Sequence, residues 1–107
     1  MAITSAICTS FKQQLLVGTH NFTNGGNSFK LALYTSSATL GAGSTVFVTT
    51  GQASGTNYTT GGSALTNVTP FATGTTGVCD FNDLTFSNAT ITARGCLIYN
   101  DTQGDKA

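Results

Sequence analysis

Hydrophobic and polar residues alternate most clearly in the segment FKLALYT, residues 29–35. Phe29, Leu31 and Leu33 share one face of an extended chain, and the residues between them share the other face. A run of this length and period is typical of a strand that places one face in the core. We therefore expect a strand over residues 29–35.

Four further segments show less regular patterns of the same kind, separated by glycine, asparagine and threonine turns, and the last of them is the longest strand candidate. They are TVFVTT at 45–50, SALTNVTP at 63–70, TTGVCDF at 75–81 and ATITARGCLIYN at 89–100. Pro70 should end its strand, because proline cannot donate a hydrogen bond to a sheet. In the last segment Leu97 and Tyr99 share a face, and Gly95 is expected to mark a bulge.

The N-terminal segment has a helical period instead. Its apolar residues recur every three or four positions, at Ile7, Cys8, Phe11 and Leu15. Thr4 is placed to cap the first turn, and Gly18 can adopt the left-handed conformation that ends a helix. We expect a helix over residues 4–17, which must pack against a sheet because so short a helix is marginal in isolation.

These elements predict a single domain over residues 1–107, with its strands within residues 28–100. The predicted fold class is mainly β or α+β. A short N-terminal helix would pack on an antiparallel β-sandwich or a partly open barrel of about six or seven strands.

The C-terminal segment NDTQGD has the composition of a hairpin turn, and the sequence ends at Ala107. A turn without a returning strand would leave the ladder of residues 94–99 unpaired on one side. Three explanations stay open: a disordered chain end, a partner strand from another subunit, or a sequence shortened relative to its natural form.

Charged residues make up 7% of the chain, against roughly a quarter in an ordinary globular domain. The four Lys and Arg residues equal the acidic residues in number and are scattered, so we expect no nucleic-acid binding, which depends on clustered positive charge. A net charge of zero gives weak repulsion between copies and favours self-association.

No segment approaches the ~20 apolar residues of a membrane span. The N-terminal sequence MAITSAICTSFKQQLL has neither the basic nor the apolar part of an export signal. We expect synthesis in the cytoplasm without export, and no membrane partner.

Residues with catalytic potential are few and scattered. His20 follows the predicted helix with no acidic residue near it in sequence, so we interpret it as a loop or capping residue. Cys8, Cys79 and Cys96 lack metal-binding spacing and lie in apolar patterns, and we expect all three to be small buried residues. We predict that the protein is not an enzyme.

Oxygen ligands for a metal ion concentrate in two turns. They are Asp80, Asn82 and Asp83, with Asn100, Asp101 and Asp105 near the end of the sequence. Calcium takes six to eight oxygen ligands, but the pattern lacks the glycine and terminal glutamate of an EF-hand loop. Glycine motifs that bind phosphate are absent as well. We predict no metal and no cofactor, with a weak calcium site at Asp80 and Asp83 left open.

Three segments, SFKLALYTSSATLGAGS, GTNYTTGGSALTNVTP and NATITARGCLIYN, resemble framework motifs of a group of small tailed-bacteriophage proteins. Members of that group share an A-LYTSSATLGA segment, a GTGYTAGG-type loop and an ATITARGALIYN strand. This chain departs from them at Asn57, where glycine is usual, and at Cys96. Members also continue past the position of Ala107 with a further apolar strand. The resemblance implies a virion structural protein, in head decoration or in the tail.

Resemblance and composition together predict a structural component of a virion, synthesised in the host cytoplasm. We expect a homo-oligomer whose partners are copies of itself and other virion proteins. Aromatic residues among small polar residues are typical of interfaces, and four are candidates for the assembly surface: Phe47, Tyr58, Phe71 and Phe86. Phe47 and Phe86 could instead fill the core. The alternative function is a receptor- or carbohydrate-binding module, with Tyr58 or residues 80–83 as its platform.

Overall fold

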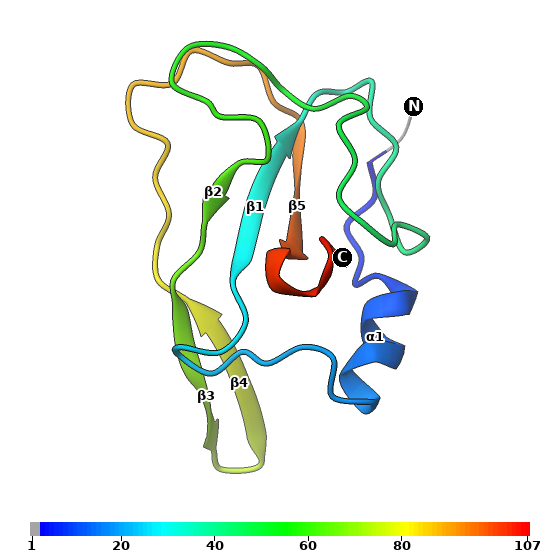
Figure 1. Cartoon of the computed structure of the whole chain (residues 1–107), viewed down its shortest axis with the longest axis vertical. Coiled ribbons are helices and arrows are strands. Elements are labelled where there is room, and N and C mark those ends of the chain that lie inside the picture. Colours follow the sequence, from blue (N-terminus) through cyan, green and yellow to red (C-terminus); the bar gives the residue numbers. More distant parts are fainter. Residues whose placement is uncertain (1–2) are drawn as a thin grey trace.

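The computed structural model describes residues 3–107, which form one short α-helix and two antiparallel sheets (Figure 1). The larger sheet has the strand order β2-β1-β5, and the smaller sheet is a ribbon of β3 and β4. The elements in chain order are α1 (Thr9–Leu16), β1 (Phe29–Tyr34), β2 (Ser63–Ala64), β3 (Asn67–Thr73), β4 (Thr76–Phe81), β5 (Gly95–Asn100) and the 3₁₀ helix η1 (Asp101–Gln103). The expected mainly β, α+β fold class is confirmed.

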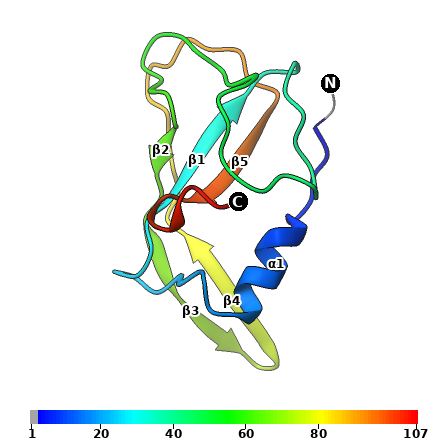
Figure 2. The same cartoon turned by 45° about the vertical axis from the view of Figure 1, so that its right-hand side comes forward.

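The ribbon extends the molecule beyond one end of the larger sheet (Figures 1 and 2). The molecule is accordingly elongated, with extents of 40 × 29 × 26 Å. The expected sandwich or barrel is not confirmed, and the described part of the chain contains five strands rather than about six or seven.

β1 is the central strand of the larger sheet and confirms the strand predicted over residues 29–35. It pairs antiparallel with β5 along its whole length, with Lys30 opposite Tyr99 and Ala32 opposite Leu97. On its other side it pairs with the short β2. This central position makes β1 the scaffold on which both neighbouring strands depend.

The core lies on one face of this sheet, and four buried residues of β1 and β5 form its centre: Ala32, Tyr34, Leu97 and Tyr99. Buried residues from other segments complete it: Cys8, Ala38, Leu40 and Ala107. Leu31 and Leu33, expected to face the core, are only half-buried, because the covering residues pack on the other face. The alternation was predicted correctly, but the more buried face was not.

The segment 45–50 is not a strand, contrary to expectation. Only Val46 forms an isolated bridge, with Lys106. The hydroxyl of Tyr34 donates to the carbonyl oxygen of Val48 at 2.6 Å, which fixes the segment over the core through a side chain rather than through a ladder. It therefore covers the sheet as an extended loop.

The predicted helix start and the cap at Thr4 are wrong, because residues 3–8 form an extended arm. The N–H of Thr4 donates to the carbonyl oxygen of Leu40 at 2.9 Å, which holds the arm beside a loop. Cys8 takes the N-cap position without a side-chain cap bond. Gly18 follows the last turn with a φ of 78°, as predicted for the end of the helix. No helix within residues 3–107 has the length and apolar character to cross a membrane.

Two expectations about proline and glycine are also wrong. Pro70 lies inside β3, where the pairing with β4 shifts register between Val68 and Phe71 and so accommodates a residue that has no N–H. Gly95 is the first residue of β5 rather than a bulge within it. The preceding residues 89–94, expected as strand, are irregular apart from one isolated bridge.

The chain end packs against the rest of the molecule, so the explanation of a disordered end is wrong. The N–H of Asn100 donates to the carbonyl oxygen of Lys106 at 2.7 Å, and the N–H of Phe47 donates to that of Asp105 at 2.9 Å. Ala107 is buried. These contacts reach only the Asn100 end of β5, so the other two explanations stay open.

Candidate functional site

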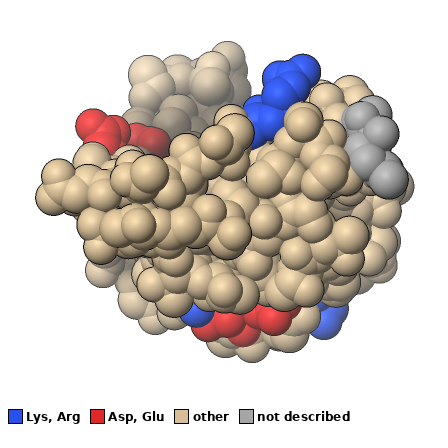
Figure 3. Space-filling model, turned by 90° about the horizontal axis from the view of Figure 1, so that it is seen from above, with Lys and Arg blue, Asp and Glu red and all other residues tan. Residues whose placement is uncertain are grey.

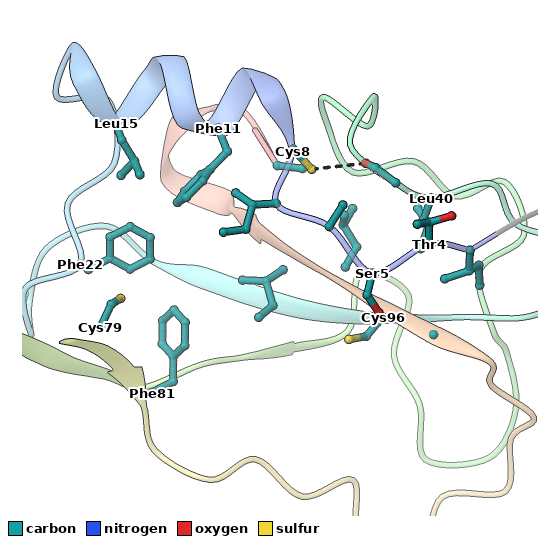
Figure 4. A pocket seen from close by; sticks show the side chains of 18 of the residues that line it. Thr4, Ser5, Cys8, Phe11, Leu15, Phe22, Leu40, Cys79, Phe81 and Cys96 are labelled. Atoms are coloured by element: carbon teal, nitrogen blue, oxygen red, sulfur yellow. Dashed lines mark hydrogen bonds between the residues drawn. The ribbon is translucent and has the colours of Figure 1, made fainter. Parts of the chain in front are cut away.

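An open apolar groove of about 1030 Å³ lies between α1, the β3–β4 ribbon and β5 (Figure 4). The N-terminal arm and α1 form one wall, and the ribbon forms the other. Among its apolar lining residues are Phe11, Leu15, Phe22, Phe71, Phe81 and Ile98. Because a large apolar cleft is the usual place for a binding site, we consider this groove first.

The helical wall is built by Phe11 and Leu15, which lie one turn apart and point toward the groove (Figure 4). No residue of α1 is buried, and Leu15 is 44% exposed. The thiol of Cys8 donates to the carbonyl oxygen of Gly41 at 3.8 Å, at the start of the helix. α1 therefore directs its apolar face into the groove, while Phe11 also packs against the edge of the core.

An aromatic cluster joins the opposite wall to the larger sheet. The ring of Phe22 stacks on that of Phe29, with centroids 4.4 Å apart and 11° between the planes. The ring of Phe81 lies 6.0 Å from Phe22 and 5.7 Å from Phe29. Since Phe29 is buried in β1 and Phe81 ends β4, the cluster fixes the ribbon beside the groove.

β5 is an edge strand, because it pairs with β1 on one side and with no other strand of residues 3–107. Alternate residues of an antiparallel strand direct their N–H and C=O groups to opposite sides. The N–H of Asn100 points away from β1, toward Lys106, so Ile98 and Cys96 present their backbone groups on the same outer side. Within the described chain, these outer groups of Ile98 and Cys96 have no backbone partner.

Exposed apolar side chains and a low charge distinguish the groove. Ile7 is 61% exposed, Phe71 52% and Ile98 44%. Among the described residues that line the groove, Arg94 alone is charged. The surface seen from above is also mostly uncharged (Figure 3). Cores of protein interfaces are depleted of charge in the same way.

The four aromatic residues predicted for an assembly surface lie in three places. Phe71 lines the groove. Phe47 is half-buried and stacks on Tyr99 with ring centroids 4.7 Å apart. Tyr58 and Phe86 lie together elsewhere, with centroids 5.6 Å apart. The structure thus pairs two of the four but does not gather them on one surface.

Tyr58 is held by its hydroxyl. This oxygen accepts a hydrogen bond from the N–H of Leu33 at 2.8 Å and donates to Oε1 of Gln52 at 3.0 Å. The same Gln52 oxygen accepts from the N–H of Gly61 at 2.8 Å. These contacts give Tyr58 a structural role between β1 and the loop that precedes β2.

His20 is buried between two amide side chains. Its Nε2–H donates to Oε1 of Gln14 at 2.8 Å, and its Nδ1 accepts from the Nδ2–H of Asn100 at 2.9 Å. Burial, with a smaller effect from the positive charge of Lys106, lowers the pKa of His20. Both ring nitrogens are therefore used to join α1 to the end of β5, and the imidazole is neutral.

The three cysteines are free thiols, but only Cys8 is buried, where burial raises its thiol pKa. Cys79 and Cys96 are exposed along the groove, so the expectation of three buried cysteines is wrong for these two. No group of three or more His, Cys, Asp or Glu residues in the described chain is arranged to hold a metal ion. Asp80 accepts from the N–H of Phe81 at 2.8 Å, which is a local backbone contact.

Lowering the pH from about 7.0 to about 5.5 is expected to lower the Tm through His20. Because the folded pKa of His20 lies below its usual value of 6.5, the unfolded chain binds a proton more readily in this range. The stabilisation is complete above about pH 6.5 and is lost as the pH falls through the folded pKa. A protonated Nδ1 could no longer accept from Asn100. Calorimetric Tm values across this range measure the effect.

The matched variant for this test is His20→Gln, which removes the single histidine of the sequence. We expect it to be less stable than the original protein at pH 7.0, with a Tm that changes little down to pH 5.5. An equally steep decline in both proteins would show that His20 is not the titrating group.

Comparison with known proteins gives no family assignment. No protein-family model matches the chain, and neither the curated proteins nor the solved structures include a significant match. A functional proposal therefore depends on the groove, on the edge strand and on the sequence segments described above.

Proposed function

We propose that the protein is a structural subunit of a tailed-bacteriophage particle, in head decoration or in the tail. It assembles with copies of itself and with other virion proteins after synthesis in the host cytoplasm. It forms homo-oligomers and has no catalytic role. The resemblance of the segments around β1, β2 and β5 to small tailed-phage proteins gives the biological setting of the proposal.

The observation that carries the proposal is the convergence of exposed apolar side chains on an unpaired strand edge. Leu15, Phe71 and Ile98 come from three separate elements and all line one groove. Exposed apolar side chains that lie singly are normal on a protein surface, whereas a group of them gathered in one groove is typical of an interaction site. A neighbouring subunit would remove these side chains from water and also pair the edge.

The polar groups near the groove support assembly more than catalysis. Both nitrogens of His20 are held by amides, and the buried thiol of Cys8 donates to a backbone carbonyl. Nucleophilic catalysis needs a thiol or hydroxyl within reach of a free base. Burial instead raises the pKa of Cys8 and keeps it protonated.

Replacing Ile98 by lysine is expected to weaken self-association about tenfold or more, because it places a charge in the apolar centre of the contact. Sedimentation velocity over a concentration series measures this. The matched control is Leu16→Lys, since Leu16 is 89% exposed but lies outside the groove lining. Equal association of the two variants would argue against the groove as the contact.

The virion setting has its own test. Purified particles of the source phage should yield peptides of this chain when digested and analysed by mass spectrometry, in a fixed ratio to the major capsid protein. Their consistent absence from intact, infectious particles would refute the setting, whatever the purified chain does alone.

A further inference from the structure

We propose that His20 is a pH-sensitive switch that controls the helical wall of the groove. A proton on its Nδ1 removes the hydrogen bond that joins α1 to the end of β5, and the last turn of α1 then moves away from the sheet. The switch regulates the proposed assembly function, because this turn carries part of the contact surface. Only that consequence rests on the proposed function.

The amide neighbours of His20 fix where the ring carries its proton. The N–H of Asn21 can only donate, and it donates to Oδ1 of Asn27 at 2.8 Å. The N–H of Gln103 likewise donates to Oδ1 of Asn100 at 3.2 Å. Nδ2 of Asn100 therefore faces Oδ1 of Asn27 at 3.0 Å and Nδ1 of His20 at 2.9 Å, and it donates to both. Nδ1 of the ring is thus an acceptor, and the single ring proton lies on Nε2.

A second proton on the ring has no acceptor in this network. On Nδ1 it would point at Nδ2 of Asn100, which is itself a donor. Rotating the Asn100 amide by half a turn would bring its oxygen to the ring. The same rotation would set two oxygens against each other at Asn27 and two donors against each other at Gln103. The network therefore holds only the neutral form of His20.

The remaining surroundings of His20 also oppose a positive charge. Within residues 3–107, the charged group that acts on the ring is Lys106, and burial followed by this positive charge lowers the pKa of His20. The groups that contact the ring from the surrounding elements are uncharged: Phe11 and Gln14 of α1, Phe22 of the next loop, Phe29 of β1 and Asn100 of β5. Because none of these groups is a carboxylate, a protonated ring gains no ion pair that could replace its bond to Asn100.

The two ends of α1 are held by different contacts. The N–H of Thr9, the first residue of α1, donates to the carbonyl oxygen of Ala42 at 2.9 Å. Near the other end, Oε1 of Gln14 accepts from Nε2 of His20 at 2.8 Å. Leu16, the last residue, is 89% exposed and adds little packing. A charge on His20 therefore releases the last turn, while the start of the helix stays in place.

Release of this turn changes the groove. Leu15 follows Gln14 in the chain and lines the groove from α1 (Figure 4). Phe11, one turn earlier, contacts the ring of His20 with centroids 4.7 Å apart and lines the same wall. Both side chains belong to the apolar surface proposed for subunit contacts. That surface is complete when His20 is neutral and loses Leu15 when the ring is charged.

Amide exchange in the free chain tests the release. The N–H of Thr19 donates to the carbonyl oxygen of Gln14 at 2.9 Å and reports on the end of α1, and the N–H of Thr9 reports on its start. NMR-detected protection factors are measured from about pH 7.5 to about pH 4.5, together with the titration of the His20 ring carbons. We expect the protection of Thr19 to fall about tenfold or more as the ring titrates, and that of Thr9 to change less than about twofold. Because the pKa of His20 is lowered, this fall should be centred below the usual value of 6.5.

His20→Gln and Asn100→Asp are the matched variants. The first cannot titrate at this position, so the protection of Thr19 should not depend on pH. The second supplies a carboxylate oxygen to a proton on Nδ1, so the ring should titrate at a higher pH and Thr19 should stay protected when the ring is charged. If Thr19 stays protected in the original protein while its ring becomes charged, or if Thr9 loses protection equally, the switch is refuted whatever the variants do.

Sedimentation velocity at the same pH values tests the consequence for assembly. Self-association of the original protein should weaken about tenfold or more as His20 is protonated, and that of His20→Gln should stay constant. A release of Thr19 without weaker association would refute the regulation of the groove. Failure to associate at any pH would count against the proposed function, and the exchange data would still decide whether the switch exists.

Discussion

Replacing Gly62 by alanine is expected to lower the free energy of unfolding by about 3 kcal/mol or more. Gly62 has a φ of 82°, a conformation that residues with a Cβ rarely adopt. An added Cβ would also fall on the carbonyl oxygen of Leu31 and lie 2.8 Å from the Cα of Ala32. These atoms belong to the backbone of the central strand, so they cannot move aside without disturbing its pairing.

The matched control is Gly43→Ala. Gly43 has no positive φ and nothing within 4 Å of an added Cβ, so the change should stay within about 1 kcal/mol and can be stabilising. Urea unfolding measures the free energy of unfolding of both variants. Their m-values should be equal, which the same experiment checks. Equal stability of the two variants would mean that the close approach of the loop to β1 is absent in solution.

The second large effect is expected at Asn100. Its Nδ2 donates to Nδ1 of His20 at 2.9 Å and to Oδ1 of Asn27 at 3.0 Å, and its Oδ1 accepts from the N–H of Gln103 at 3.2 Å. Asn100 is fully buried. Asn100→Ala would leave Nδ1 of the buried His20 and the N–H of Gln103 without a partner, at about 1–3 kcal/mol for a buried group, and would empty a fully buried side-chain site. Oδ1 of Asn27 would keep the N–H of Asn21 as a donor. We expect a loss of about 3 kcal/mol or more in the free energy of unfolding.

Asn82→Ala serves as the control for this substitution. Asn82 is exposed, and only its backbone N–H takes part in a hydrogen bond, to the carbonyl oxygen of Thr66. The change should be within about 0.5 kcal/mol. If chemical unfolding gives Asn100→Ala the same small effect, the network between α1, the loop before β1 and η1 contributes little to stability.

The strands that could be predicted from sequence are those in which apolar and polar residues alternate locally. Residues 29–35 alternate over several positions and have a glycine- and asparagine-rich loop before them, and they form β1. TTGVCDF forms β4 for the same reason. An alternating pattern predicts a strand because the side-chain period of two places alternate residues on the same face of the sheet, and this does not depend on contacts distant in sequence.

The predictions that were wrong concern segments whose conformation depends on contacts with residues distant in sequence. The segment 45–50 alternates as well as β4 does, but the hydroxyl of Tyr34 and the bridge to Lys106 hold it as a loop over the core. Residues 4–8 belong to the predicted helix, but the hydrogen bond from Thr4 to Leu40 holds them extended as part of the arm. These contacts join positions tens of residues apart, and no local pattern encodes them.

The groove was predicted only in part. Phe71 was a predicted interface residue and lies in the groove. Leu15 was visible only as a member of an apolar helical period, and such a period looks the same whether it packs in a core or lines an open surface. Ile98 was visible only as one position of the strand predicted over residues 89–100. The ladder of residues 94–99 was expected to lack a partner on one side, and β5 has one neighbouring strand within residues 3–107.

The central claim is that the outer edge of β5 is a contact between subunits. Hydrogen exchange of the Ile98 and Cys96 amides, compared between the free chain and assembled particles, measures this directly. We expect fast exchange in the free chain and at least about tenfold slower exchange in particles. The Leu97 and Tyr99 amides should exchange slowly in both states, because they pair with β1. Equally fast exchange at Ile98 and Cys96 in the assembled state would contradict it.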